Sequence, residues 1–269
     1  MQTKKSLGQH FLRDVNTISR IIDSFKTLTI NKENFFVIEV GPGDGALTRS
    51  LIDCYDNIVL IDCDKKIIDF ACENFGNKTS KIIHQDATLN LASTILELKK
   101  EKEDIFIISN LPYNVGAIIL LNAISVADKW NGGVFMLQKE VVDRLVAQTS
   151  SKSYGKISII FQIFFQVKRI INVSGASFSP ATQVTSTVFS MLPRSENIVR
   201  FLKYFKEMSG FLTVAFSSRR KFAIKAFYEY FDSNLVDEFY SNNKLDTKMR
   251  IEEFYPLQIA EMVEFLTNN

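Results

Sequence analysis

The sequence contains few residues that bind metals. His10 and His84 are the only histidines among 269 residues, and three cysteines stand nine positions apart at Cys54, Cys63 and Cys72. The cysteines form no CxxC pair and have no histidine cluster beside them, which argues against a zinc site. We therefore expect no metal, and we interpret the cysteines as free, buried thiols in a reducing cytosol.

Membrane and secretion signals are also absent. The longest strongly apolar stretch, Ile157 to Val167, is shorter than the roughly 20 residues that span a bilayer. The first residues, MQTKKSLGQHFLRD, contain no apolar signal-peptide region. We therefore expect a cytoplasmic protein with no membrane partner.

Net charge gives little indication of a partner. The formal charge is +2, and 23% of the residues are charged, so a claim of nucleic-acid binding must rest on local clusters of charge. The phosphate-loop pattern GxxxxGKS/T does not occur, so no triphosphate site is expected. There is no internal repeat and no low-complexity segment.

Strand and helix patterns alternate through the first 150 residues. Short apolar runs, each followed by helical periodicity, occupy residues 35–40, 58–62, 81–84, 105–109 and 134–137. Five such units predict a parallel sheet covered on both faces. A further helix from Ile157, for which a strand is the alternative, and strands at 167–173 and 184–192 follow. Only helical periodicity remains after Ser195, so we predict an α/β domain at 1–193 and a small helical domain at 194–269.

Polar or glycine-rich motifs follow four of the predicted strands. The first strand ends in Gly41–Gly45, the second ends at Asp62, the third is followed by Asp86, and the fourth by Asn110. Each signal alone is weak, because a glycine pair can be a simple turn and an aspartate can cap a helix. Together they lie at one sheet edge, where such folds bind ligands. An acid at Asp62 suits ribose hydroxyls and one at Asp86 suits an adenine amine, which favours S-adenosylmethionine, a nucleoside cofactor without a pyrophosphate.

The stretch Asn110-Leu111-Pro112-Tyr113 has a stiff backbone. Proline fixes its own φ and pushes Leu111 toward an extended conformation. The Asn110 side chain, an outward carbonyl and the Tyr113 ring could grip a planar base that carries an amino group. An ordinary strand-ending turn is the alternative for these four residues taken alone.

Five stretches resemble a known family. Val37–Gly45 is similar to the first motif of class I S-adenosylmethionine-dependent methyltransferases, and Asn110–Tyr113 to the motif of those that methylate exocyclic amines. Leu7–Leu12 resembles the N-terminal cofactor-covering motif of the ribosomal RNA adenine dimethyltransferases, Met136–Val141 their fifth-strand segment, and Ala215–Lys221 the basic helix of their C-terminal domain. The resemblance runs nearly end to end.

The resemblance implies a fold, a reaction and a substrate. The fold would be Rossmann-like, with a mostly parallel seven-stranded sheet and a small all-helical C-terminal domain. The reaction would dimethylate N6 of two adjacent adenosines in a hairpin loop near the 3′ end of 16S rRNA in the immature 30S subunit, leaving S-adenosylhomocysteine. A monomer would carry this out in the cytoplasm, during subunit biogenesis.

The resemblance also assigns residues. The cofactor would be lined by His10, Leu12, Gly41, Asp62, Asp86 and Asn110. Asn110 and the Leu111 carbonyl would accept the two N–H groups of the target amine, while Tyr113 and Phe178 would stack on the base. Local charge, independently of the resemblance, predicts the RNA contacts: Arg219, Arg220 and Lys221 would contact phosphates, and Lys4, Lys5, Arg13 and Arg20 form a second basic region.

Two other functions remain open. One is the related 23S rRNA adenine methyltransferase of the macrolide-resistance type. The other is a non-catalytic RNA-binding assembly factor that keeps the fold. Tests with 16S and 23S substrates separate the first, and a test of S-adenosylmethionine binding separates the second.

Overall fold

Residues 10–101 and 104–269 are described by the computed structural model, in which they form two compact units. The first unit contains the described residues up to Val142 together with Lys168–Pro193, and the second contains Asp143–Val167 together with Arg194–Asn269. The break after Pro193 coincides with the predicted boundary, but the segment Asp143–Val167 differs from the prediction. Its helix is apolar on nearly every side and packs on C-terminal helices, a long-range partnership that no sequence pattern announces.

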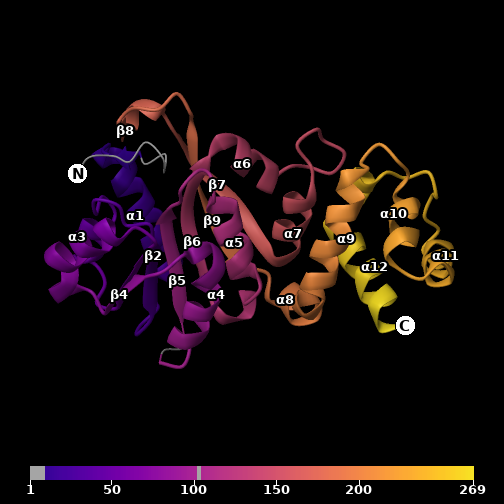
Figure 1. Cartoon of the computed structure of the whole chain (residues 1–269), viewed down its shortest axis with the longest axis horizontal. Helices are drawn as coiled ribbons and strands as arrows, with labels where there is room; N and C mark the ends of the chain where they lie inside the picture. The colour runs from indigo at the N-terminus through magenta and orange to yellow at the C-terminus, as the bar shows by residue number, and fades with distance from the viewer. Residues whose placement is uncertain (1–9, 102–103) are drawn as a thin grey trace. The chain divides into compact units, whose positions relative to one another are not determined.

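A seven-stranded sheet forms the centre of the first unit (Figure 1). In spatial order its strands are β4 (Lys81–His84), β3 (Ile58–Asp62), β2 (Phe36–Val40), β5 (Ile105–Asn110), β6 (Gly132–Gln138), β9 (Ser186–Pro193) and β7 (Phe165–Val173). The strands from β4 to β6 are parallel, and β9 runs antiparallel to β6. The mostly parallel seven-stranded sheet is thus confirmed. The central strands β2 and β5 are almost wholly buried because helices cover both faces.

One helix precedes the sheet and others follow its parallel strands, and several of them begin at an aspartate. They are α1 (Val15–Thr29), α2 (Thr48–Leu51), α3 (Lys65–Phe75), α4 (Ala87–Leu98), α5 (Gly116–Ile124) and α6 (Lys139–Leu145). The Asp14 side chain accepts hydrogen bonds from two backbone N–H groups at the start of α1. Asp64 and Asp86 cap α3 and α4 in the same way. The caps at Asp64 and Asp86 set the starts of α3 and α4 just beyond the carboxyl ends of β3 and β4.

A small two-stranded ribbon accompanies the sheet. Strand β1 (Phe11–Leu12) pairs antiparallel with β8 (Phe178–Ser179). The backbone N–H of Arg13 donates to the carbonyl of Ser177 over 2.8 Å, which extends the pairing. Two-residue strands show no periodicity, so the sequence gives no sign of this ribbon. It places the chain around residue 11 beside the 174–182 loop.

The second unit is helical. It contains α7 (Lys156–Phe164), α8 (Ser195–Phe201), α9 (Phe205–Ser217), α10 (Ala223–Tyr230), α11 (Ser233–Asn242) and α12 (Pro256–Asn268). Aromatic rings fill its core: Phe211 and Phe227 stack with centroids 4.2 Å apart, and the buried Tyr154 hydroxyl donates to the carbonyl of Phe254 over 2.9 Å. In the described parts of the chain, none of the helices is both long and apolar enough to cross a membrane.

Candidate active site

The glycine turn after β2 requires its glycines. Gly41, Gly43 and Gly45 have φ values of +71°, +57° and +84°, which L side chains adopt at a cost. A Cβ at Gly43 would approach the Phe11 ring to 3.2 Å, and one at Gly41 would face the Asn110 carbonyl oxygen at 3.9 Å. The turn therefore lies close to both the N-terminal strand and the end of β5.

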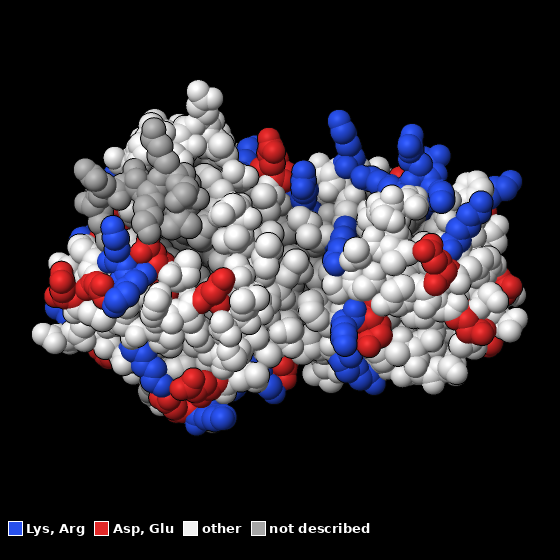
Figure 2. Space-filling view, viewed as in Figure 1, with Lys and Arg blue, Asp and Glu red and all other residues white. Residues whose placement is uncertain are grey.

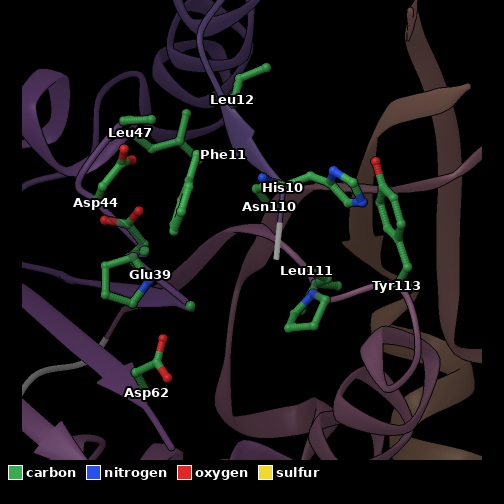
Figure 3. A pocket seen from close by; sticks show the side chains of 15 residues that line it. His10, Phe11, Leu12, Glu39, Asp44, Leu47, Asp62, Asn110, Leu111 and Tyr113 are labelled. Carbon is green, nitrogen blue, oxygen red and sulfur yellow. The ribbon is translucent and has the colours of Figure 1, made fainter. Parts of the chain in front are cut away.

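A cavity opens where these segments meet (Figure 3). The cavity and its mouth together contain about 720 Å³ of space, part of which is open to solvent. The predicted residues among those that line it are His10, Leu12, Gly41, Asp62, Asn110, Leu111 and Tyr113. The structure thus brings together seven residues that lie up to 103 positions apart, a separation read from residues 10 and 113.

Asp62 brings a carboxylate to the cavity from the end of β3. Its Oδ1 accepts a hydrogen bond from the backbone N–H of Asp64 over 2.8 Å. Burial raises the pKa of this carboxyl to about 6, and the hydrogen bond opposes that rise. A partly buried carboxylate at this edge is suited to accept hydrogen bonds from hydroxyl groups of a ligand.

Glu39 is a buried acid in the cavity wall that the sequence prediction did not assign. It lies in β2 and is 2% exposed, and the Thr48 hydroxyl donates to its Oε2 over 2.7 Å. Burial raises the pKa of Glu39 to about 7, against the effect of that hydrogen bond. An acid in an otherwise apolar buried strand was the available signal. Phe11, Asp44 and Leu47 also line the cavity without having been predicted.

Asn110 and Leu111 present unused acceptors at the end of β5. The Ser109 hydroxyl donates to the carbonyl of Val40 over 2.5 Å and ties β5 to β2 just before the site. The Leu111 N–H donates to the Met136 carbonyl over 3.1 Å. Within residues 10–101 and 104–269, no group hydrogen-bonds to the Asn110 side chain or donates to the Leu111 carbonyl. Both acceptors are therefore available to a ligand.

Tyr113 is held by a hydrogen bond at its hydroxyl and by a contact between its ring and that of His10. Its hydroxyl shares a 2.5 Å hydrogen bond with the Ser186 hydroxyl, and its pKa is raised by burial. The His10 ring lies nearly parallel to it, at 6.3 Å between centroids and 27° between planes (Figure 3). The Nδ1–H of His10 donates to the Pro180 carbonyl over 2.8 Å. The two rings thus form a positioned aromatic wall.

Two predicted site residues do not line the cavity. Asp86 is exposed, and its Oδ1 accepts hydrogen bonds from the Thr88 N–H and hydroxyl over 2.8 and 2.6 Å. It thus caps α4, which was the alternative interpretation of this residue. Phe178 is 4% exposed and packs in the core with Leu12 and Val173. The Phe178 ring therefore has a packing role in the core, which explains why an aromatic residue occupies this position.

The predicted RNA-binding residues lie after a helix rather than within one. Helix α9 ends at Ser217, and Arg219, Arg220 and Lys221 occupy the turn that follows. The Arg219 guanidinium donates to the carbonyls of Ser151 and Lys152, each over 3.0 Å, and lies 3.5 Å from the Glu252 carboxylate. Arg219 therefore holds the turn in place.

Exposed cations surround this turn. Arg220 and Lys221 are exposed and form no ion pair with any described residue. Figure 2 shows lysine and arginine side chains gathered along the upper edge of the second unit. Arg200 is different, because Glu264 on α12 pairs with it at 2.6 Å. In the other predicted basic region, Lys4 and Lys5 lie outside the described residues.

The cysteine prediction needs a correction. All three cysteines are free, but they are exposed rather than buried. Cys54 lies in the turn after α2, Cys63 follows β3 and Cys72 occupies a solvent-facing position of α3, so low polarity was a poor guide to their burial. Among the described residues, no group of three or more His, Cys, Asp or Glu side chains could hold a metal ion.

Comparison with known proteins gives matches along the whole chain. Residues 1–268 match the family described as Ribosomal RNA adenine dimethylase. Two proteins named Ribosomal RNA small subunit methyltransferase A, from Francisella tularensis subsp. novicida and subsp. tularensis, are 33% identical over 99% of this chain and 98% of theirs.

Two solved structures share the fold. A dimethyladenosine transferase from Plasmodium falciparum superposes with a TM-score of 0.72 at 20% identity, covering 96% of this chain and 97% of the other. The 23S rRNA methyltransferase ErmE gives 0.64 at 16% identity, covering 96% and 99%. At these identities the two likenesses establish the Rossmann-like methyltransferase fold and leave the substrate open.

Proposed function

This chain belongs to the ribosomal RNA adenine dimethylase family, and on that premise we propose that it dimethylates N6 of two adjacent adenosines in a hairpin loop near the 3′ end of 16S rRNA. The family makes it an S-adenosylmethionine-dependent methyltransferase. The observation that carries the proposal is the pair of unused acceptors, the Asn110 side chain and the Leu111 carbonyl, at the cavity edge.

The cavity residues fit S-adenosylmethionine. The left-handed glycine turn gives a ligand close access to the backbone. Asp62 would accept hydrogen bonds from the ribose hydroxyls, while His10, Leu12 and Asn110 line the remaining wall. The Asp86 Oδ1 caps α4, so only its other carboxylate oxygen, Oδ2, would be left to accept a hydrogen bond from the adenine amine. When bound, the cofactor supplies an electrophilic methyl group on a sulfonium.

Asn110 and Leu111 prepare the nucleophile. The N6 lone pair of adenine is delocalised into the ring, which makes the amine a poor nucleophile. Acceptance of its two N–H groups by the Asn110 Oδ1 and the Leu111 carbonyl favours a pyramidal nitrogen whose lone pair is free. Positioning supplies most of the acceleration, so no general base is required and the proton leaves after the methyl group arrives.

Tyr113 provides the stacking surface for the target base. Its hydrogen bond to Ser186 and its contact with His10 hold the ring before RNA arrives. Stacking of a base on an aromatic ring contributes roughly 1–3 kcal/mol. We assign Phe178 a supporting role, since it is part of the ribbon that begins directly after His10 and its ring packs in the core.

RNA affinity would come from exposed cations. Arg220 and Lys221 would contact phosphates, whereas Arg219 holds their turn through its bonds to the Ser151 and Lys152 carbonyls. A hairpin loop is a suitable target because its bases are already unpaired. We propose that the protein acts as a monomer on immature 30S subunits in the cytoplasm.

Mass spectrometry of rRNA tests the proposal. Unmodified 30S particles and protein-free 23S rRNA are incubated separately with the protein and S-adenosylmethionine, and nuclease fragments are weighed. We expect two methyl groups on each of two adjacent adenosines of 16S rRNA. Methylation of 23S rRNA alone would establish the macrolide-resistance type instead. No methylation, together with no cofactor binding by calorimetry, would establish a non-catalytic assembly factor.

A further inference from the structure

Phe222 is an exposed aromatic residue on a fixed backbone. Its side chain is 42% exposed. It directly follows the basic turn Arg219–Lys221 in the sequence. The backbone of Phe222 forms an antiparallel bridge with Arg250, and the next N–H, that of Ala223, donates to the Met249 carbonyl over 2.8 Å. The ring is therefore held at the surface without the cover that a structural aromatic residue normally has.

A cavity lies beside this ring in the second unit. Its apolar side is formed by Ala215, Ala223 and Ile251. Its polar lining includes Ser218, Lys221 and Lys225. An apolar floor next to an exposed ring and a rim of hydrogen-bonding groups suit a flat, partly polar ligand.

The charge around the cavity favours an anionic chain. Lys221 and Lys225 are exposed and form no ion pair in the described parts of the chain. The neighbouring Arg220 is also exposed and forms no ion pair with a described residue. Glu229 is the acid in the lining, and its carboxylate can accept an N–H from a base. Lysines flanking an aromatic ring form the arrangement used to bind single-stranded nucleic acid, with bases on the ring and phosphates on the cations.

We propose that this cavity is a second nucleotide site, in which an unpaired nucleobase of the RNA stacks on Phe222 while neighbouring phosphates contact Lys221 and Lys225. The inference rests on the proposed function in taking RNA as the ligand. It adds a base contact, distinct from the target base, to a surface from which only phosphate contacts were expected. It would place the second unit on an unpaired stretch of RNA rather than on a duplex.

Binding of short RNAs by the full-length protein tests this site. The probes are a fluorescein-labelled single-stranded deca-adenylate and a ten-base-pair RNA duplex, measured by anisotropy. We expect Phe222→Leu to weaken single-strand binding roughly 5- to 150-fold, the equivalent of roughly 1–3 kcal/mol of stacking, with duplex binding unchanged. Lys225→Ala should weaken binding and lower the salt slope by about 0.7.

Matched variants separate a stacked base from general damage. Tyr255, another exposed aromatic of the second unit, and Lys206, another exposed lysine, do not line the cavity. Tyr255→Leu and Lys206→Ala should leave single-strand affinity within twofold. Phe222→Trp should keep the affinity and add fluorescence that the RNA quenches, because the chain's one tryptophan, Trp130, is 2% exposed in the first unit.

The outcomes distinguish this site from the proposed function. The site would be overturned if Phe222→Leu bound single-stranded RNA as tightly as the wild type. It would also be overturned if Phe222→Trp lost as much affinity as Phe222→Leu. A 30S substrate left unmethylated while the Phe222 effect persists would overturn the proposed function and support the site. Methylation without any Phe222 effect would overturn the site alone.

Discussion

Arg13, directly after strand β1, forms an ion pair with Asp44 in the glycine turn. The Asp44 side chain is 13% exposed, and its Oδ1 is buried with no hydrogen-bond partner in the part of the chain that the structure describes. The Phe11 ring lies over Gly43 on the same side. The ion pair thus fastens the N-terminal strand to the turn that lines the cavity.

Loss of this ion pair should weaken cofactor binding. Arg13→Ala leaves the Asp44 carboxylate buried and unpaired, which disfavours the packing of strand β1 against the glycine turn. We expect a several-fold rise in the dissociation constant for S-adenosylhomocysteine, measured by calorimetry. In Asp44→Asn the unpaired charge is absent, so adding Arg13→Ala to it should have little further effect.

The double-mutant cycle has a clear control. Arg20 is an exposed arginine on α1 with no ion pair among the described residues, so Arg20→Ala should bind the cofactor normally. Strictly additive effects of the Arg13 and Asp44 substitutions would show that the pair does not couple the strand to the turn.

The elements that the sequence predicts well are those with a local signal. Strands Ile58–Asp62 and Lys81–His84 have the predicted bounds, because short apolar runs are read within a few residues. The cavity edge was also predictable, since parallel strands deliver Gly41, Asp62 and Asn110 to one side of the sheet.

Features that depend on distant partners were not predictable. Ribbon β1–β8 joins segments more than 160 positions apart, and its closure buries Phe178. In the sequence Arg219 cannot be told apart from its basic neighbours, yet its guanidinium donates hydrogen bonds to the carbonyls of Ser151 and Lys152. Glu39 was visible as an acid in an apolar strand, but the rise of its pKa follows from its burial in β2. In each case tertiary packing, rather than local propensity, sets the role of the residue.

Cofactor binding should weaken in mild acid. Burial raises the pKa of Asp62 to about 6, and a protonated carboxyl accepts fewer hydrogen bonds from a ribose. The binding constant for S-adenosylhomocysteine should therefore be constant above about pH 7 and fall, by at most tenfold per pH unit, below pH 6. Asp62→Asn should bind weakly with no such fall. A wild-type binding constant that is level from pH 5 to 8 would contradict the ribose assignment.

Glu39→Gln should change the pH dependence of stability. Burial raises the pKa of Glu39 from 4.5 to about 7, so between these values the folded state holds a proton that the unfolded state releases. The stabilisation is present below pH 4.5 and is lost as pH rises through 7. At pH 8 the Gln variant, which still accepts the Thr48 hydroxyl, should be more stable than wild type, by at most about 3 kcal/mol.

Urea unfolding at pH 5 and pH 8 measures this effect. The free-energy difference between Glu39→Gln and wild type should grow from the lower to the higher pH. Thr48→Val is the companion variant, because it removes the hydroxyl that donates to Glu39 and should raise the carboxyl pKa further. An equal difference at both pH values would mean that Glu39 is ionised in the folded protein throughout the range.

Asn110→Ala should slow methyl transfer far more than it weakens cofactor binding, because Asn110 is only one of several residues that line the cofactor cavity. The Asn110 side chain would meet the target amine, and loss of one preorganised hydrogen-bonding group at a reacting centre typically lowers kcat by roughly 10²–10³. Transfer of tritiated methyl to 30S particles gives kcat, and calorimetry gives cofactor affinity. Asn114→Ala is the control, because Asn114 is exposed four residues later and does not line the cavity. Near-normal turnover in Asn110→Ala would contradict the assignment of Asn110 as an acceptor that orients the target amine.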